Sequence, residues 1–212
     1  MHDLKNPLAV IELETELIRQ DLAACPPSVR AAVRRIRDNV AFMDRLVRDL
    51  LDRAALDDGQ LVIRRHPTEL SSLIAETVDR SVPAAERPRV CIEVREAVTV
   101  TVDELRIQRV VANLVDNALK HAPRDTRVTV RIERTGELAC VSVIDGGSGV
   151  DAEHTAYLFD KYTRASTADG SGLGLYISRR IVEAHGGHLG FARDPDASSR
   201  FFFALPAAEP ER

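Results

Sequence analysis

Three polar residues at helical spacing are the first candidates for chemistry in this chain. Asn113, Asn117 and Lys120 are separated by four and three residues, and side chains at these separations are neighbours on a helix. An amide oxygen is a hard, neutral ligand that suits Mg2+, an ion that keeps waters and phosphate oxygens as its other ligands. The spacing therefore predicts that Asn117 binds a metal ion. Capping or local hydrogen bonding by the two Asn side chains is the alternative.

Two glycine-rich segments farther along the chain suit a nucleotide. Asp145 opens the first, where a buried carboxylate could accept a hydrogen bond from the amino group of adenine. Gly147 and Gly149 would let the backbone approach the base, since neither has a Cβ. The second segment, residues 170–175, opens a helix whose free N–H groups and positive dipole end favour phosphate. A dinucleotide-binding turn would need GxGxxG rather than GxGxG, and a strand where the polar residues 163–169 stand.

A histidine near the start of the chain is a candidate nucleophile. The imidazole of His2 has an ordinary pKa of about 6.5, so a large fraction is neutral and nucleophilic near pH 7. Asp3 could orient the ring or accept its proton as the nitrogen attacks. Asn6 lies four residues after His2, on the same helix face, where its amide could position a water molecule.

The N-terminal segment that carries this histidine predicts two long helices. Apolar residues recur at steps of three and four over residues 4–22 and again over residues 29–54. Cys25-Pro26-Pro27 separates the two patterns, and Ser28 is the expected N-cap of the second helix. A short turn between long helices makes an antiparallel hairpin. The apolar stripe of the second helix is wider than one partner helix covers, which predicts a dimeric four-helix bundle.

The rest of the chain predicts a mixed α/β domain. Helices are expected at residues 68–80, 103–121 and 173–184, and strands at 90–94, 98–102, 127–134, 138–144, 188–192 and 200–205. The polar, glycine-rich segment 146–172 is typical of a functional lid. The expected organisation is a helical hairpin at 1–58, a linker at 59–65, an α/β domain at 66–207 and a tail at 208–212.

Composition and charge exclude several classes of protein. The 212 residues are 44% hydrophobic and 29% charged, which suits one or two soluble domains. A net charge of -4 argues against nucleic acid as a partner. No apolar run approaches the roughly 20 residues that span a bilayer, and no signal peptide is evident. Cys25, Cys91 and Cys140 lack metal-ligand spacing, so reduced, mostly buried thiols in a cytoplasmic protein are expected.

Taken in order, these motifs resemble the catalytic core of the sensor histidine kinases of two-component systems. The residues that carry the likeness are 2–8 for the H box, 113–120 for the N box, 145–149 for the first glycine box, 157–164 for the F box and 170–175 for the second glycine box. The resemblance covers nearly the whole chain. It implies an α + α/β architecture: a HisKA-type dimerisation and phosphoacceptor hairpin followed by an α/β sandwich of the GHKL ATPase type.

The resemblance also implies a role for individual residues. His2, Asp3 and Asn6 would be catalytic, and Asn117 would bind Mg2+. The implied ATP contacts are Asn113, Asn117, Lys120, His121, Asp145, Gly147, Gly149, Tyr162, Arg164, Gly170, Gly172, Leu173, Gly174 and Leu175. Gly146 departs from the Asn that is usual in the first glycine box, which should loosen the lid, and Tyr162 replaces a usual Phe. The family's histidine lies well inside a helix, so this chain is expected to be a shortened core in which His2 occupies a fraying first turn.

The implied function is transfer of a phosphoryl group from ATP to His2 and then to an aspartate of a separate response regulator, in a homodimer. Phosphatase activity through Asn6 and membrane attachment through a segment absent from this chain are further expectations. Two alternatives stay open. A GHKL-type ATPase of the gyrase or chaperone kind would carry Glu four residues before the metal-binding Asn, but residue 113 is Asn. A catalytically silent dimerisation module that binds nucleotide is the other.

Overall fold

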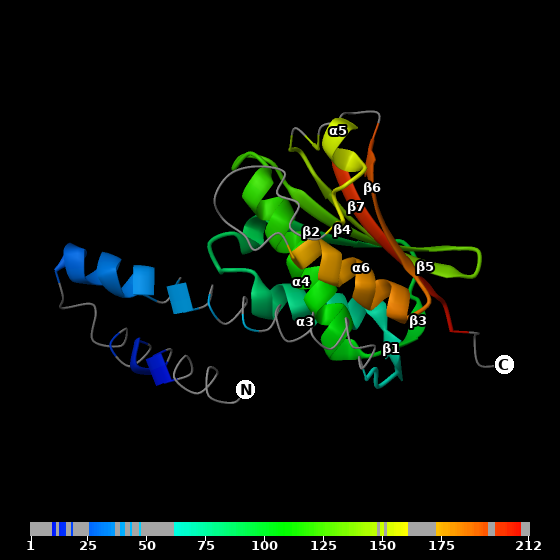
Figure 1. Cartoon of the computed structure of the whole chain (residues 1–212), viewed down its shortest axis with the longest axis horizontal. Helices are drawn as coiled ribbons and strands as arrows, with labels where there is room; N and C mark the ends of the chain where they lie inside the picture. The colour runs from blue at the N-terminus through cyan, green and yellow to red at the C-terminus, as the bar shows by residue number, and fades with distance from the viewer. Residues whose placement is uncertain are drawn as a thin grey trace. The chain divides into compact units, whose positions relative to one another are not determined.

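The computed structural model describes residues 62–147, 149–150, 152–160, 173–194 and 198–208, together with helical residues scattered between 10 and 47 and Pro26. The chain divides into two compact units, Met1–Leu61 and Val62–Arg212 (Figure 1). This division falls in the segment where the sequence predicts a linker. No helix in these described parts is long and apolar enough to cross a membrane.

The second helix of the first unit begins one residue earlier than its expected cap. Residues 27–36 are helical, and the N–H groups of Val29 and Arg30 donate to the carbonyl of Pro26 at 3.0 and 3.2 Å. Proline is well suited to the first helical position because the N–H that it lacks has no helical partner there. The prediction of Ser28 as the N-cap is therefore wrong, because Ser28 lies inside the first turn.

Apolar residues of this helix fall on two lines with different exposure. Val33 and Val40 are 6% and 3% exposed, whereas Val29, Ile36 and Met43 are 40%, 45% and 42% exposed. Within each set the residues are seven apart, so each set forms one line along the helix. One line of the predicted seam is covered within the single chain and the other is open.

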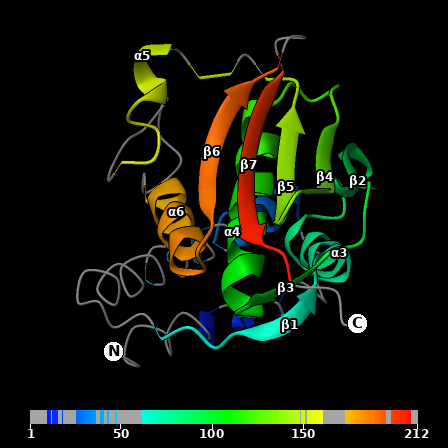
Figure 2. The same cartoon turned by 90° about the vertical axis from the view of Figure 1, so that its right-hand side faces the viewer.

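A five-stranded mixed sheet forms the frame of the second unit (Figure 2). The strands, in spatial order, are β2 (Val90–Val94), β4 (Val128–Thr135), β5 (Leu138–Asp145), β7 (Ser199–Pro206) and β6 (His188–Arg193). Only the β2–β4 pair of this sheet is parallel. The hairpin between β4 and β5 turns at Gly136, whose φ of 62° is in the region that favours glycine.

The two faces of this sheet differ in polarity. Val128, Val130 and Ile132 are fully buried, and the residues between them are only half-buried. On the opposite face Arg131 Nε lies 3.1 Å from Glu93 Oε2, across the β2–β4 pair. The period-two alternation thus gives the sheet one apolar face for helices to cover.

Helices α3 (Leu70–Ser81), α4 (Glu104–His121) and α6 (Gly174–Ala184) lie on the apolar face (Figure 2). The middle helix, α4, packs against both of the others and against β4 and β5. Its buried residues Ile107, Val110, Val111, Leu114 and Ala118 follow the helical repeat, which explains why this segment folds as an amphipathic helix. The remaining elements are β1 (His66–Glu69), which pairs with β3 (Thr99–Val102), η2 (Arg87–Arg89) and α5 (Ala152–Thr155).

Two expectations about this unit are corrected by the structure. The first helix begins at Leu70 rather than at residue 68, and its N-cap is Glu69, which accepts hydrogen bonds from the N–H groups of Ser71 and Ser72. The thiols were expected to be mostly buried, yet Cys91 is exposed on the edge strand β2 and Cys140 is half-buried. An edge strand has no neighbouring strand on one side, so its side chains are more open to solvent.

Candidate nucleotide-binding site

Helix α4 carries four of the predicted site residues in its second half. Its N-cap is Asp103, whose carboxylate accepts the N–H of Arg106 at 3.3 Å. Asn113 and Asn117 are half-buried, whereas Lys120 and His121 are exposed at the end of the helix. From residue 113 to residue 121 the helix axis rises by about 12 Å, at 1.5 Å per residue. The predicted residues are therefore spread along one line rather than gathered at a point.

The amide of Asn113 contacts one turn of α6. Its Nδ2 donates to Ser178 Oγ at 3.0 Å, and a Cβ added to Gly174 would lie 2.5 Å from its Oδ1. Gly174 and Ser178 are four residues apart and so lie on one face of α6. The structure thus brings the first Asn of α4 against the start of α6, and it does so only because residue 174 has no side chain.

The other end of α4 meets the end of β5. Asp145 is 4% exposed, and its Oδ1 accepts the N–H of Gly147 at 2.7 Å. Burial raises the pKa of Asp145, while the hydrogen bond from Gly147 and the charge of His121 act in the opposite direction. A Cβ on Gly147 would lie 2.6 Å from Asp145 Oδ1 and 3.2 Å from the carbonyl oxygen of His121. Asp145, Gly147 and the end of α4 therefore form a second cluster.

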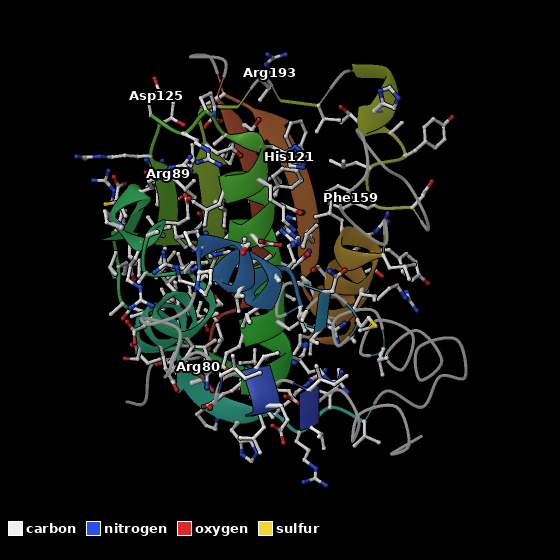
Figure 3. All side chains as sticks on the ribbon, turned by 90° about the vertical axis from the view of Figure 1, so that its left-hand side faces the viewer. Arg80, Arg89, His121, Asp125, Phe159 and Arg193 are labelled. Atoms are coloured by element: carbon white, nitrogen blue, oxygen red, sulfur yellow. The ribbon has the colours of Figure 1, made fainter. Side chains whose placement is uncertain are left out.

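Figure 3 shows His121 at this end of α4, whereas Arg80 lies toward the opposite end of the unit. Arg80 Nη2 donates to Gln108 Oε1 at 2.6 Å, close to the first turn of α4. Both clusters of predicted site residues lie beside the second half of α4, whereas this bond lies beside its first half.

The loop after β5 requires glycine at residue 149. Gly149 has a φ of 77°, a conformation that residues with a Cβ seldom adopt. A Cβ there would also lie 3.4 Å from Ser199 Oγ and 3.5 Å from Arg193 Cζ. The glycine therefore lets the loop turn beside the start of β7.

Lys120 and Leu173 have partners within the protein. Lys120 Nζ lies 2.6 Å from Asp116 Oδ2, with side-chain exposures of 40% and 47%. Such an exposed pair at i,i+4 contributes only about 0.3–0.5 kcal/mol, so a phosphate group could replace Asp116 as the partner. The side chain of Leu173 is buried in the core and its carbonyl accepts the N–H of Ile177 at 2.8 Å, which leaves a packing role for this residue. Leu175 is half-buried in the first turn of α6.

The remaining predicted residues lie outside the described parts of the chain, and their roles stay predictions. They are His2, Asp3, Asn6, Tyr162, Arg164, Gly170 and Gly172. The predicted lid at 146–172 is described only at its start and around α5.

Sequence reasoning missed Ser178, the partner of Asn113. Ser178 is 2% exposed and stands on the buried face of α6 between Ile177 and Ile181 in the sequence. A hydroxyl on a buried helix face needs a hydrogen-bond partner, and this requirement was the available signal.

It also missed a junction between the start of α4 and the end of α6. His185 is 4% exposed, its Nε2 accepts the N–H of Asp103 at 3.0 Å, and its Nδ1 lies 2.7 Å from the carbonyl of Ile181. Because Nε2 is an acceptor, the ring proton is on Nδ1 and the imidazole is neutral. Burial lowers the pKa of His185, and Arg65 and Arg106 act in the same direction.

The segment before β1 binds to this same junction. The N–H of Arg64 donates to Asp103 Oδ2 at 3.1 Å, and Arg65 Nη2 donates to the carbonyl of Ala184 at 2.8 Å. Both ring nitrogens of His185 are engaged, and His188 packs edge-on against Phe202 at 5.9 Å.

Two family models match this chain in order. Residues 1–59 match the His Kinase A (phospho-acceptor) domain, and residues 102–209 match the histidine kinase-, DNA gyrase B-, and HSP90-like ATPase. The chain therefore belongs to the histidine kinase branch of this ATPase family and is a sensor histidine kinase catalytic core. The matches confirm the predicted fold class and the resemblance.

Named relatives agree with this assignment. The sensor histidine kinase TrcS of Mycobacterium tuberculosis is 35% identical over 98% of this chain, and the match covers 42% of TrcS. The mycobacterial sensor histidine kinase MprB has a structure with a TM-score of 0.61 and 28% identity, covering 68% of this chain and 100% of that chain. Full-length ShkA in complex with AMPPNP has a TM-score of 0.76 and 24% identity, covering 100% of this chain and 45% of that chain. This chain thus spans less than half the length of TrcS.

Proposed function

We propose that this chain transfers the γ-phosphoryl group of ATP to His2 and passes it to an aspartate of a response regulator. The observation that carries the proposal is the order of a phospho-acceptor domain and an ATPase domain in one chain, with Asn113 against Gly174 and Asp145 against Gly147 in the second. The alternative of a GHKL-type ATPase is not favoured, because a carboxylate is absent at residue 113, where the ATPase relatives carry their general base.

The adenine would bind at the Asp145 cluster. The Oδ1 of Asp145 is bonded to Gly147, and the other carboxylate oxygen can accept the adenine amino group. Residue 147 lies between this carboxylate and the carbonyl of His121, where there is no room for a side chain, so only glycine fits. The phosphates would extend along α4 toward the start of α6, where the first-turn N–H groups of a helix favour an anion.

The donor set on α4 fits Mg2+. Asn117 offers a neutral amide oxygen from a half-buried position one turn after Asn113, and phosphate oxygens and waters would complete the six ligands. When bound, the ion neutralises phosphate charge. The chain's own part is to position the donor: Asn117 and Lys120 orient the phosphates, and Asp145 fixes the base.

His2 would accept the phosphoryl group. A ring nitrogen forms a bond to the γ-phosphorus, the bond from that phosphorus to the oxygen bridging to the β-phosphate breaks, and ADP leaves with the electron pair. Asp3 accepts the proton that the imidazole releases. Asn6 would hold water against the aspartyl phosphate of the regulator in the reverse, phosphatase reaction.

The first unit would dimerise through its open apolar line. Ile11 and Ile18 are 39% and 45% exposed and seven residues apart, as are the exposed Val29, Ile36 and Met43 of the second helix. Heptad-spaced apolar residues left exposed in one chain suit a second copy of the hairpin. The proposal is a homodimeric four-helix bundle.

Radiolabel transfer from [γ-32P]ATP tests the function in the dimeric chain. We expect protein-bound label that is acid-labile and base-stable, and no such label in His2→Gln, which should bind ATP as tightly as the unmodified chain. Asn117→Ala should abolish Mg-ATP binding. Label that persists in His2→Gln would place the acceptor elsewhere. Rapid release of free phosphate without protein-bound label would favour the ATPase. Asn113→Glu should raise ATP hydrolysis, because a carboxylate there can act on water as in the ATPase relatives. Phosphate release that is already high in the unmodified chain and falls in this variant would favour the ATPase.

A further inference from the structure

A single buried hydroxyl of α6 engages the proposed phosphate end of the site. Ser178 is 2% exposed, and in the described part of the chain its Oγ accepts one hydrogen bond, from Asn113 Nδ2 at 3.0 Å. Burying a hydroxyl without a hydrogen-bond partner is unfavourable, because the hydroxyl gives up its bonds to water. Ser178 is therefore paired with the amide that the proposed function places beside the phosphates.

The amide of Asn113 lies with its oxygen toward the start of α6. With Nδ2 held by Ser178, the Oδ1 of Asn113 lies 2.5 Å from the position that a Cβ of Gly174 would occupy. The first-turn N–H groups of a helix lack helical partners and carry the positive end of its dipole. An oxygen is favoured there over an NH2 group, so the helix end selects the orientation of the amide, and Ser178 accepts the NH2 group that is left on the other side.

The surroundings of Asn113 leave it little freedom. Gly174 and Ser178 stand four residues apart on α6, so the amide lies across a single turn of that helix. The absent Cβ at residue 174 provides the space, and the hydroxyl at residue 178 provides the anchor. Neither feature is needed for the apolar packing of α6, which rests on Ile177, Ile181 and Val182.

We propose that Ser178 is a positioning residue for phosphoryl transfer. It holds the amide of Asn113 with its oxygen toward the start of α6, where a neutral acceptor can meet the hydrated metal ion or a water bound to the phosphates. This inference rests on the proposed function, because it assigns Asn113 to the nucleotide site. Ser178 acts through Asn113 and does not itself contact the nucleotide.

A double-mutant cycle on the full chain tests this role. We expect Ser178→Ala to weaken Mg-ATP binding by about five- to tenfold in calorimetry, and to raise KM for ATP in autophosphorylation while kcat changes less than twofold. In the Asn113→Ala background, Ser178→Ala should change the affinity by less than twofold. Ser142→Ala is the matched control, because Ser142 is 3% exposed on β5 and lies on the polar face of the sheet.

The outcomes separate the inference from the proposed function. Equal losses of affinity in both backgrounds would show that Ser178 acts through the packing of α6 and would overturn the inference, as would an unchanged affinity in Ser178→Ala. If Asn113→Ala itself leaves Mg-ATP affinity unchanged, the site assignment fails and the inference falls with it. Ser178→Thr retains the hydroxyl, and its affinity for Mg-ATP is expected within about twofold of the unmodified chain. A tenfold loss of affinity in Ser178→Thr with unchanged thermal unfolding would overturn the inference.

Discussion

Asp145 and His185 are buried to the same extent, at 4% exposure, and yet their hydrogen bonding differs. Both ring nitrogens of His185 are bonded to backbone groups, of Asp103 and Ile181. Asp145, among the residues that the structure describes, accepts one hydrogen bond, from Gly147. An ionised carboxylate can accept about four. The hydrogen-bonding capacity of His185 is fully used by the protein, whereas the carboxylate of Asp145 can still accept a hydrogen bond from another donor.

The comparison separates a structural polar group from a binding group. Burial moves both pKa values toward the neutral forms, upward for Asp145 and downward for His185, so the shifts alone do not distinguish the two. The two groups are distinguished by their unused hydrogen-bonding capacity, which Asp145 has and His185 lacks. It lies at the end of β5 beside the loop glycines, where the proposed function places adenine.

The largest expected effect is a loss of stability on removing His185, the group whose hydrogen bonds are all made within the protein. His185→Ala leaves the N–H of Asp103 without its acceptor and removes a buried ring, so we expect a loss of about 2–4 kcal/mol in the free energy of unfolding. Urea denaturation measures it. His188→Ala is the control, because His188 is exposed on β6 and loses only its edge-on contact with Phe202, so we expect a loss of less than about 1 kcal/mol. Similar losses in the two variants would end the structural interpretation of His185.

Changing Asp145, the group with unused acceptor capacity, should affect nucleotide binding instead of stability. In Asp145→Asn the Oδ1 can still accept the N–H of Gly147, but an NH2 group then faces the adenine amino group, donor against donor. We expect nucleotide affinity to fall by more than about tenfold, which is 1.4 kcal/mol. Stability at pH 7 should stay equal or rise, because a charge is no longer buried. Titration calorimetry and thermal unfolding on one preparation check both halves. A large loss of stability with unchanged affinity would reverse the comparison.

The pH dependence of unfolding sharpens the contrast. The folded-state pKa of His185 is below its ordinary value of 6.5, so the unfolded chain takes up a proton first as pH falls. The stabilisation is complete above about pH 6.5 and is lost as pH falls below it toward the folded-state pKa. The charged groups nearby are Arg65, Asp103 and Arg106. Unfolding measured between pH 8 and 5 should show this decline, and His185→Gln should lack that part of it.

Local sequence signals were sufficient for the main helices and for most of the sheet. Helix α4 was predicted at 103–121 and lies at Glu104–His121, because its apolar repeat and the cap at Asp103 act within the segment. Strand β1 was not predicted, since it has four residues, one of them a proline, and pairs with β3 in the register His66↔Val102. No local pattern encodes such a distant partner.

The same limit applies to the site. The spacing of Asn113 and Asn117 indicates a shared helix face, and the glycine runs indicate close approach of the backbone. The bond from Asn113 to Ser178 joins residues 65 apart in the chain, and the bond from Asp103 to His185 joins residues 82 apart. Both depend on how α6 packs on α4. In the sequence, these two bonds are indicated only by polar residues among the apolar positions of α6 and at its end.

Glu69, a second carboxylate, provides the smallest test of the comparison. Partial burial would raise the pKa of Glu69, but hydrogen bonds from Ser71 and Ser72 outweigh it and lower the pKa to about 2. Glu69 is thus a carboxylate whose acceptor capacity is used by the protein, as that of Asp145 is not. Its function is to cap α3, and an N-cap lost to alanine typically costs about 1 kcal/mol.

Glu69→Ala should therefore reduce stability by about 1 kcal/mol at pH 7 and leave nucleotide affinity unchanged. The folded-state pKa of about 2 is below the ordinary value of 4.5, so the stabilisation is present above pH 4.5 and is lost as pH falls from 4.5 toward 2. The difference between the variant and the unmodified chain should accordingly narrow between pH 5 and 3, measured by urea denaturation. A difference that stays constant over this range would mean that the carboxylate charge is not what stabilises the cap. If Glu69→Ala instead weakened nucleotide binding as strongly as Asp145→Asn, the completeness of hydrogen bonding would no longer separate structural acids from binding acids.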